Sequence, residues 1–200
     1  MDFFEVIRRR RSIRQFTADP VKEEDLRAML EAARLAPSAT NEQPWRFIVI
    51  RDRDFIKELQ GMVNALLESH LEAAPDEGRR EHIKAMRYYA TSFGGAPVLI
   101  AVLTRPWPAA RPELQGKQPF DSGLQSVAAA IAHLHLAATA LGYGSCWATA
   151  PIDFAGPELE AMLGVERPWS LVALVAVGGA DRTPREPHRK SLEEIATFIG

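Results

Sequence analysis

A long stretch without charged side chains constrains the fold of this chain more than any other feature of its sequence. No Asp, Glu, Lys or Arg occurs over residues 122–152, although charged residues make up 25% of the chain. A membrane-spanning helix is disfavoured there, because the stretch is rich in alanine, includes polar side chains and is interrupted by Gly142. We therefore expect a buried helix over residues 124–141, followed by a strand over residues 144–150.

The expected helix has apolar residues on nearly every side, so other parts of the protein must cover it all round. In a chain of 200 residues this places the helix either at the centre of the fold or on a face shared with a second copy. The second arrangement would make the protein a homodimer.

Helical and strand patterns alternate along the rest of the chain. Helices are expected over 2–10, 23–35, 54–72, 79–93, 153–163 and 191–199, and strands over 45–50, 97–104 and 169–177. The strand at 97–104 is apolar throughout, which indicates burial on both faces. Ser191 and Glu194 have the spacing of a capping box. About four strands among these helices predict a single α+β domain over residues 1–200, with a small mixed or antiparallel central sheet wrapped by helices.

A proline-rich segment interrupts this pattern. Four prolines fall within residues 105–119, which predicts a flexible loop or flap rather than a domain linker, because regular patterns resume at once. Trp107 within it is a candidate for covering a substrate.

The overall composition excludes several classes of protein. The chain has 24 Lys and Arg against 26 Asp and Glu, a balance that argues against a protein that coats nucleic acid or an anionic membrane. The single cysteine, Cys146, rules out an internal disulfide and any multi-cysteine zinc pattern. Residues 1–14 lack the apolar core of a signal peptide. These features lead us to expect a cytoplasmic protein.

Arginine is concentrated near the N-terminus, where five arginines lie within residues 8–14 with no acid among them. Three interpretations are open. Cations at the end of a helix complement its dipole and simply face water. A nucleic-acid-binding arm would need a matching basic stripe, which the rest of the sequence lacks. Arginine forks beside a serine hydroxyl, here Ser12, are suited to binding a phosphate.

A polar loop is expected over residues 36–45, between the end of a helix and the start of a strand. Hydroxyl and amide side chains lie between its two prolines: Ser38, Thr40, Asn41 and Gln43. Such groups can recognise the edge of a heterocycle or a sugar chain. In the alternative, this is an ordinary loop whose side chains satisfy its own backbone.

The order of these motifs resembles that of the FMN-dependent nitroreductase family. The motifs are Arg10-Arg-Ser-Ile-Arg-Gln-Phe16, the loop from Pro37 to Trp45, residues 141–147 after the alanine-rich helix, and the segment 184–194. The resemblance spans nearly the whole chain apart from residues 53–120. It implies a nitroreductase-like fold whose long buried central helix lies at a homodimer interface.

The resemblance also implies which residues bind FMN. In the N-terminal motif these are Arg10, Arg11, Ser12 and Arg14, with Arg10 holding the phosphate together with Arg189. Arg14 would lie near N1 and O2 of the isoalloxazine ring. A fixed cation there stabilises the negative charge of the reduced flavin, so Arg14 would tune the cofactor.

Further contacts implied by the resemblance come from two other segments. The other subunit would contribute Pro37, Ser38, Ala39 and Asn41, and the backbone around Gly144 and Ser145 would line the second side of the flavin. Ala39 departs from the family pattern, in which Ser or Gly is common. The residues that read the pyrimidine edge are not identifiable within 79–93, where Arg87 is a candidate by position alone.

The activity implied by the resemblance is that of an oxidoreductase. FMN would take a hydride from NADH or NADPH and pass electrons to a small acceptor, such as a nitroaromatic or a quinone, by a ping-pong mechanism. Because the flavin carries the chemistry, no catalytic side-chain set is expected. The alternatives are other flavin chemistry on the same fold, namely flavin fragmentation or dehalogenation, and a flavin-binding protein without turnover. No nucleic-acid or membrane partner is expected.

Three other motifs are given structural interpretations. His133 and His135 are two residues apart, so they do not share a helix face and are expected to be core or interface histidines rather than metal ligands. Gly142-Tyr-Gly144 lacks the third glycine of a dinucleotide-binding fingerprint. Cys146 lies in an apolar segment and is expected to be a buried, inert thiol.

Overall fold

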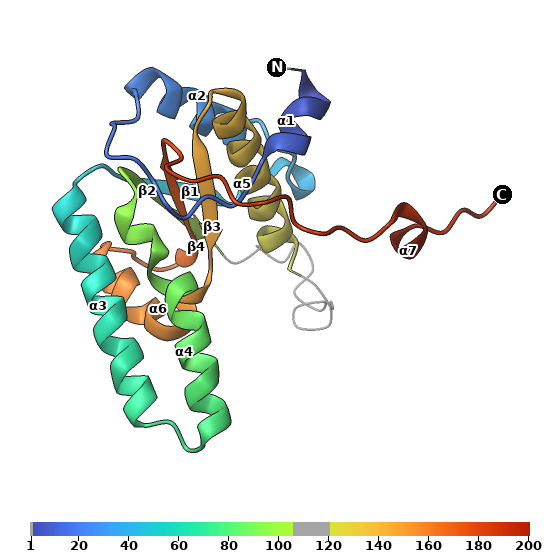
Figure 1. The fold of residues 1–200 in the computed structure, drawn as a ribbon. Coiled ribbons are helices and arrows are strands. Elements are labelled where there is room, and N and C mark those ends of the chain that lie inside the picture. The colour runs from blue at the N-terminus through green and yellow to red at the C-terminus, as the bar shows by residue number, and fades with distance from the viewer. Residues whose placement is uncertain (1, 106–120) are drawn as a thin grey trace.

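The computed structural model describes residues 2–105 and 121–200 (Figure 1). The helices are α1 (Phe3–Arg9), α2 (Glu23–Arg34), α3 (Arg53–Glu72), α4 (Glu77–Thr91), α5 (Ser122–Ala140), α6 (Ala150–Met162) and α7 (Leu192–Ile195). The strands are β1 (Trp45–Ile50), β2 (Val98–Thr104), β3 (Gly144–Ala148) and β4 (Ser170–Gly178). Apart from Arg105, the expected flap and its Trp107 lie outside the described residues.

The four strands form one antiparallel sheet in the order β1-β2-β4-β3. The long strands β2 and β4 occupy the centre, where Ile100 is paired with Val175. At the two edges, Trp45 of β1 faces Thr104, and Gly144 of β3 faces Gly178. A small mixed or antiparallel sheet was expected, and the antiparallel form is the one observed.

Helices cover both faces of the sheet (Figure 1). Along β2, alternate residues enter two different apolar clusters, because successive side chains of a strand point to opposite faces. One cluster contains Val98, Ile100 and Val102 and is completed by α2 and α5. Residues 99, 101 and 103 enter the other, which is completed by α3, α4 and α6. This explains why the strand is apolar throughout, as expected.

The central helix α5 is buried on one side only. Its buried residues include Val127, Ile131 and Leu134, whereas Leu124 is 45% exposed and Ala132 is also exposed. A single chain therefore does not cover the helix all round. Among the described residues, no helix combines the length and the apolar character needed to cross a membrane.

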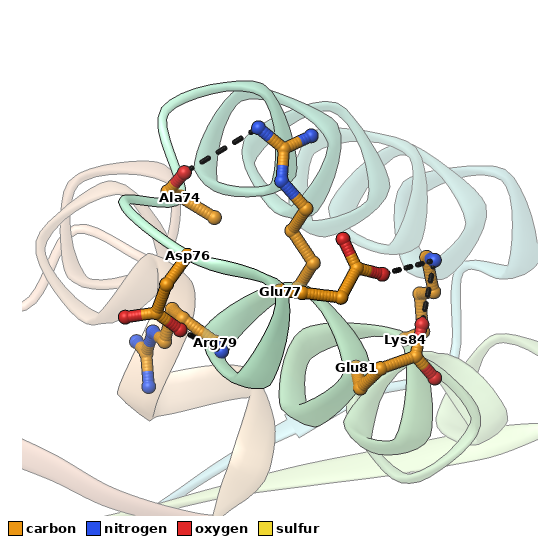
Figure 2. Close-up of polar contacts among 7 residues, drawn as sticks. Ala74, Asp76, Glu77, Arg79, Glu81 and Lys84 are labelled. Atoms are coloured by element: carbon orange, nitrogen blue, oxygen red, sulfur yellow. Dashed lines mark hydrogen bonds and ion pairs between the residues drawn. The ribbon is translucent and has the colours of Figure 1, made fainter.

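The helices α3 and α4 form a pair that extends beyond the sheet, and polar contacts fix the turn between them (Figure 2). Asp76 caps α4, its carboxylate accepting a hydrogen bond of 2.8 Å from the Arg79 amide. The Lys84 ammonium lies 2.7 Å from Glu81 and 3.7 Å from Glu77. These exposed contacts order the tip of the pair, far from the N-terminal arginines along the chain.

The elements other than β1 differ from their expected bounds by one or more residues, and two regions differ for a clear physical reason. The strand β3 ends at Ala148 rather than residue 150, because α6 already begins at Ala150, where Pro151 suits the first helical turn. The last helix was expected over residues 191–199, and this was wrong: α7 is a single turn. Its capping box with Ser191 is present, but Ala196 is extended. The cap marks where the helix begins, whereas the apolar side chains of Ile195 and Phe198 at its far end are exposed on the described structure.

Candidate functional site

The arginine-rich segment after α1 is extended and held against the sheet. The Ile13 amide donates to the Ser145 carbonyl at 2.9 Å, and Ser12 pairs with Ser145 in a parallel bridge. Ile13 is buried against Gly144, where a Cβ would come within 2.7 Å of the isoleucine side chain. Since Ile13 points inward, the side chains on either side of it are directed away from the core.

These outward side chains meet the C-terminal segment around one cavity of about 330 Å³. It is lined by Arg10, Arg11, Ser12, Arg14, Pro184, Arg185, Pro187 and Arg189. The structure thus brings together all five residues assigned to this part of the site, although Arg189 is distant in sequence from the other four. It adds Arg185, which lay within the quoted tail segment but was given no role.

The cavity is strongly cationic because its lining contains five arginines and, among the described residues, no carboxylate. Arg11 lies 3.5 Å from Glu186 and donates to the carbonyl of Arg10, so its charge is partly engaged. Neither Arg10 nor Arg14 forms an ion pair with a described carboxylate. Several guanidinium groups converge here with capacity to bind an anion.

An aromatic side chain from α4 joins this site. The guanidinium carbon of Arg14 lies 5.1 Å from the centroid of the Tyr89 ring, within the range of a cation–π contact. Tyr89 in turn packs edge-on against Tyr88. Arg87, the earlier candidate in this helix, is instead paired with Glu68 of α3. No sequence signal linked Tyr89 to Arg14, since the two residues are far apart in the chain.

The loop before β1 lies elsewhere on the molecule and does not line this cavity. Its residues 39–41 form a short 3-10 turn, η1 (Ala39–Asn41). The Ala39 amide donates to Ser126 Oγ of α5 at 3.2 Å, and Ser38 Oγ accepts from the Gln43 amide at 3.0 Å. Ser38 therefore satisfies the loop's own backbone, as in the ordinary-loop alternative. Pro37 and Asn41 belong to the same loop.

This loop is also strained. Thr40, Asn41 and Gln43 have φ angles of 48°, 58° and 51°, in the left-handed region that side-chain-bearing residues seldom adopt. Conformations of this kind persist only where the surroundings enforce them, and they are concentrated at functional sites. The strain favours a functional role for the loop over that of a simple connection.

Gly144 and Ser145 lie beneath the arginine segment and do not line the cavity. Both are buried, with Ser145 only 2% exposed. Its hydroxyl lies 2.6 Å from Nδ1 of His135 on α5. On the described structure, these two residues support the site from the core side.

The three other motifs have the following places in the described structure. Nδ1 of His133 contacts the Ala32 carbonyl at 3.2 Å, and the described part of the chain contains no cluster of three metal-binding side chains. Gly142 has a φ of 86° and ends α5, with the Tyr143 amide bonded to the Ala138 carbonyl. Burial raises the pKa of the Cys146 thiol, although the charge of Arg14 opposes this, so the thiol stays protonated at neutral pH.

The fold and the sequence place the chain in one family. A family model described as "Nitroreductase family" matches residues 7–179, and the chain belongs to this family. It is 30% identical over 198 residues to an NADH dehydrogenase of Thermus thermophilus, covering 95% of this chain and 92% of that protein.

Two solved structures extend the comparison. A BluB-like flavoprotein from Clostridium difficile 630 has a TM-score of 0.88 and 31% identity over all of both chains. A nitroreductase with bound FMN from Desulfitobacterium hafniense has a TM-score of 0.75 and 25% identity, again over all of both chains. The predicted fold class and family are confirmed.

Proposed function

We propose that this protein is an FMN-dependent NAD(P)H oxidoreductase of the nitroreductase type, formed by a single domain that acts as a homodimer. The observation that carries this proposal is the cavity lined by Arg10, Ser12, Arg14 and Arg189 without a carboxylate among its described lining. The FMN bound by the related nitroreductase and the name of the Thermus relative support the choice of cofactor and donor.

The donor set of the cavity fits FMN. A phosphate group needs two or more cations, which Arg10 and Arg189 can provide from two separate segments of the chain, and Ser12 adds a hydroxyl donor. The arginines meet around one small cavity rather than along an extended stripe. A single phosphate group, rather than nucleic acid, therefore matches the arrangement.

When bound, FMN supplies the redox chemistry, taking a hydride from NADH or NADPH and passing electrons to a nitroaromatic, quinone or similar acceptor in a ping-pong cycle. The role of the chain is to bind and tune. Arg14 carries a fixed positive charge whose position Tyr89 restrains. Such a charge favours the anionic reduced state of a nearby ring system.

A homodimer would explain two features that one chain leaves incomplete. The α5 helix exposes Leu124 and Ala132 to solvent. The strained loop is anchored on α5 through Ser126, away from the cavity of its own chain. A second copy packed against α5 would bury the apolar side chains. We propose that it would also bring Pro37, Ser38, Ala39 and Asn41 toward the partner's flavin.

The C-terminal tail provides a second dimer contact. It extends away from the body of its own protomer (Figure 1), and Phe198 and Ile199 are 86% and 97% exposed. The edge strand β1 borders a groove of about 670 Å³ between itself and α2. Its apolar lining consists of Ala28, Leu30, Trp45, Phe47 and Val49. We propose that the apolar end of each tail occupies this groove on the partner, where it would be shielded from water.

One preparation tests the function. The purified protein should be yellow, or take up FMN, and NADH or NADPH should bleach it without oxygen; air should then restore the spectrum of intact FMN. A protein that does not take up FMN would contradict the whole proposal. A yellow protein that neither nicotinamide bleaches would be a flavin-binding protein without turnover. Loss of the flavin itself on admission of air would instead point to fragmentation chemistry.

A further inference from the structure

A buried polar pair connects the central helix to the arginine segment. His135 on α5 is 6% exposed, and its Nδ1 lies 2.6 Å from the hydroxyl of Ser145, which is itself buried. Buried polar groups destabilise a fold unless they are hydrogen-bonded, and an aliphatic residue would suit this apolar helix better. The pair therefore needs an explanation other than packing.

The backbone of Ser145 holds the segment that carries the site. Its carbonyl accepts the hydrogen bond from the Ile13 amide, and residue 145 is bridged to Ser12. These are the positions between Arg10 and Arg14. The contacts thus run from the His135 ring to the Ser145 hydroxyl, and from the Ser145 backbone to Ser12 and Ile13, which lie between the two arginines in the chain.

The charge state of the ring suits this place. Burial, together with the positive charge of Arg10, lowers the pKa of His135 to about 4, so the imidazole is neutral at pH 7. The Trp147 ring, two residues beyond Ser145 on β3, is stacked on it with centroids 6.4 Å apart. Arg10 and Arg14 are the cations that bear on this part of β3. A neutral ring can bond to Ser145 without placing a further cation behind Arg10.

We infer that His135 and Ser145 are positioning residues of the phosphate site: together they fix the register of residues 12 and 13, and so the direction in which Arg10 enters the cavity. This inference rests on the proposed binding of FMN. Neither residue lines the cavity, so both act through the backbone of the arginine segment.

The test compares FMN with riboflavin, which has the same ring system but no phosphate. In the full-length protein, Ser145→Ala should weaken FMN binding about tenfold, because the His135 ring loses its buried partner, and should change riboflavin binding less than about twofold. His135→Leu should act similarly, whereas His135→Asn can keep a polar atom near the position of Nδ1 and should restore most of the affinity.

A matched control lies next in the sequence. Cys146 is also buried, but it contributes no hydrogen bond to the arginine segment, so Cys146→Ala should leave the ratio of FMN to riboflavin affinity unchanged even if it lowers Tm. A second readout needs no flavin: Ser145→Ala should accelerate hydrogen exchange of the Ile13 amide while leaving amides of α3 unaffected.

The outcomes separate the inference from the proposed function. Equal weakening of FMN and riboflavin in Ser145→Ala, or no weakening in a folded variant, would overturn the positioning role alone. An unsubstituted protein that binds FMN no more tightly than riboflavin would overturn the phosphate site, and with it the proposed function.

Discussion

The two segments that line the arginine cavity are held in very different ways. Residues 10–14 are paired with β3 and anchored by the buried Ile13. The tail after Gly179 is exposed along nearly its whole length and is attached near its start, where the Asp181 amide bonds to the Gln15 carbonyl and Glu186 approaches Arg11. The sheet therefore fixes the position of residues 10–14, whereas the tail residues that line the cavity are held only by weak surface contacts.

This difference suggests a division of roles. Cations on a rigid support lose little entropy on binding an anion, while cations on a loosely held segment must be ordered first. We expect residues of the anchored segment to contribute more to the affinity for FMN than those of the tail. The tail residues would mainly close the site and, in the proposed dimer, connect the two subunits.

The largest effect is expected for Arg10→Ala. Loss of a charge-assisted contact from the rigid side should weaken FMN binding roughly 100-fold, at the upper end of the contribution of such bonds. Titration of the flavin-free protein with FMN measures the change. Arg9→Ala is the control, since Arg9 is exposed on α1 and pairs with Glu5 at 3.1 Å. Comparable losses in both variants would show that the cluster acts only through its net charge.

The second largest effect is expected from acid, which should lower the stability of the folded protein through His135, behind the anchored segment. The pKa of His135 is about 4 in the folded protein against 6.5 for an unperturbed histidine, so the unfolded chain binds more protons between these values. The contribution of His135 to the free energy of unfolding is fully present above about pH 6.5. It is lost as the pH decreases, so that the protein is about 2 kcal/mol less stable at pH 5. Denaturant unfolding at pH 7.5 and 5 measures this. His135→Asn should lack this part of the pH dependence, and an unchanged slope would contradict the assignment.

The tail is tested by Phe198→Ala. If the Phe198 ring is buried in the partner's groove, its loss should raise the dimer dissociation constant roughly tenfold, corresponding to about 1.5 kcal/mol for a buried aromatic side chain. Analytical ultracentrifugation over a dilution series gives the constant. Phe198→Leu should retain most of the association. A dimer unaffected by Phe198→Ala would leave the tail without the proposed role.

Arg189→Ala compares the tail directly with Arg10. We expect FMN affinity to fall about tenfold, less than for Arg10, because ordering the exposed tail offsets part of the gain from the contact. The same flavin titration applies, and Lys190→Ala serves as the neighbouring control. A loss equal to that of Arg10→Ala would show that the tail is as well ordered as the sheet-anchored segment.

The smallest effect is expected at Tyr89. Removing the ring face in Tyr89→Leu should cost about 0.5 kcal/mol of restraint on Arg14, as for an exposed cation–π contact. We expect a two- to threefold slower anaerobic reduction with little change in FMN affinity. Tyr89→Phe keeps the ring and should behave as the parent. If Tyr89→Phe is also slow, the hydroxyl rather than the ring face is what matters.

Local patterns predicted much of the fold. β1 was predicted at its observed bounds, and the apolar run of β2 indicated its burial between two helical layers. Where the prediction failed, the controlling contact was missing from the local sequence: Ser191 starts α7, but the apolar residues that would form a second turn are exposed on the described part of the chain. The start of α6 depends on Pro151, which suits the first helical turn. The prediction missed this start because it extended the preceding strand to residue 150.

The residues of the site likewise include some that the sequence could assign and some that it could not. The motif around Arg10 and the C-terminal Arg189 were assigned by resemblance, and the structure brings them to one cavity. Tyr89 and His135 could not be assigned, because their contacts with Arg14 and Ser145 arise only when separate elements pack together. A histidine in an alanine-rich helix indicates burial but does not identify its partner.

The two edges of the sheet have unequal consequences for solubility. β3 is shielded at its start by the bridge from Ser12, whereas the outer edge of β1 has no strand beside it in the described chain. The six residues of β1 are aromatic or β-branched apart from Arg46, a composition prone to stacking with copies of itself. Arg46 is then the gatekeeper of this edge, and a protein lacking its C-terminal residues would be expected to precipitate rather than persist as a monomer.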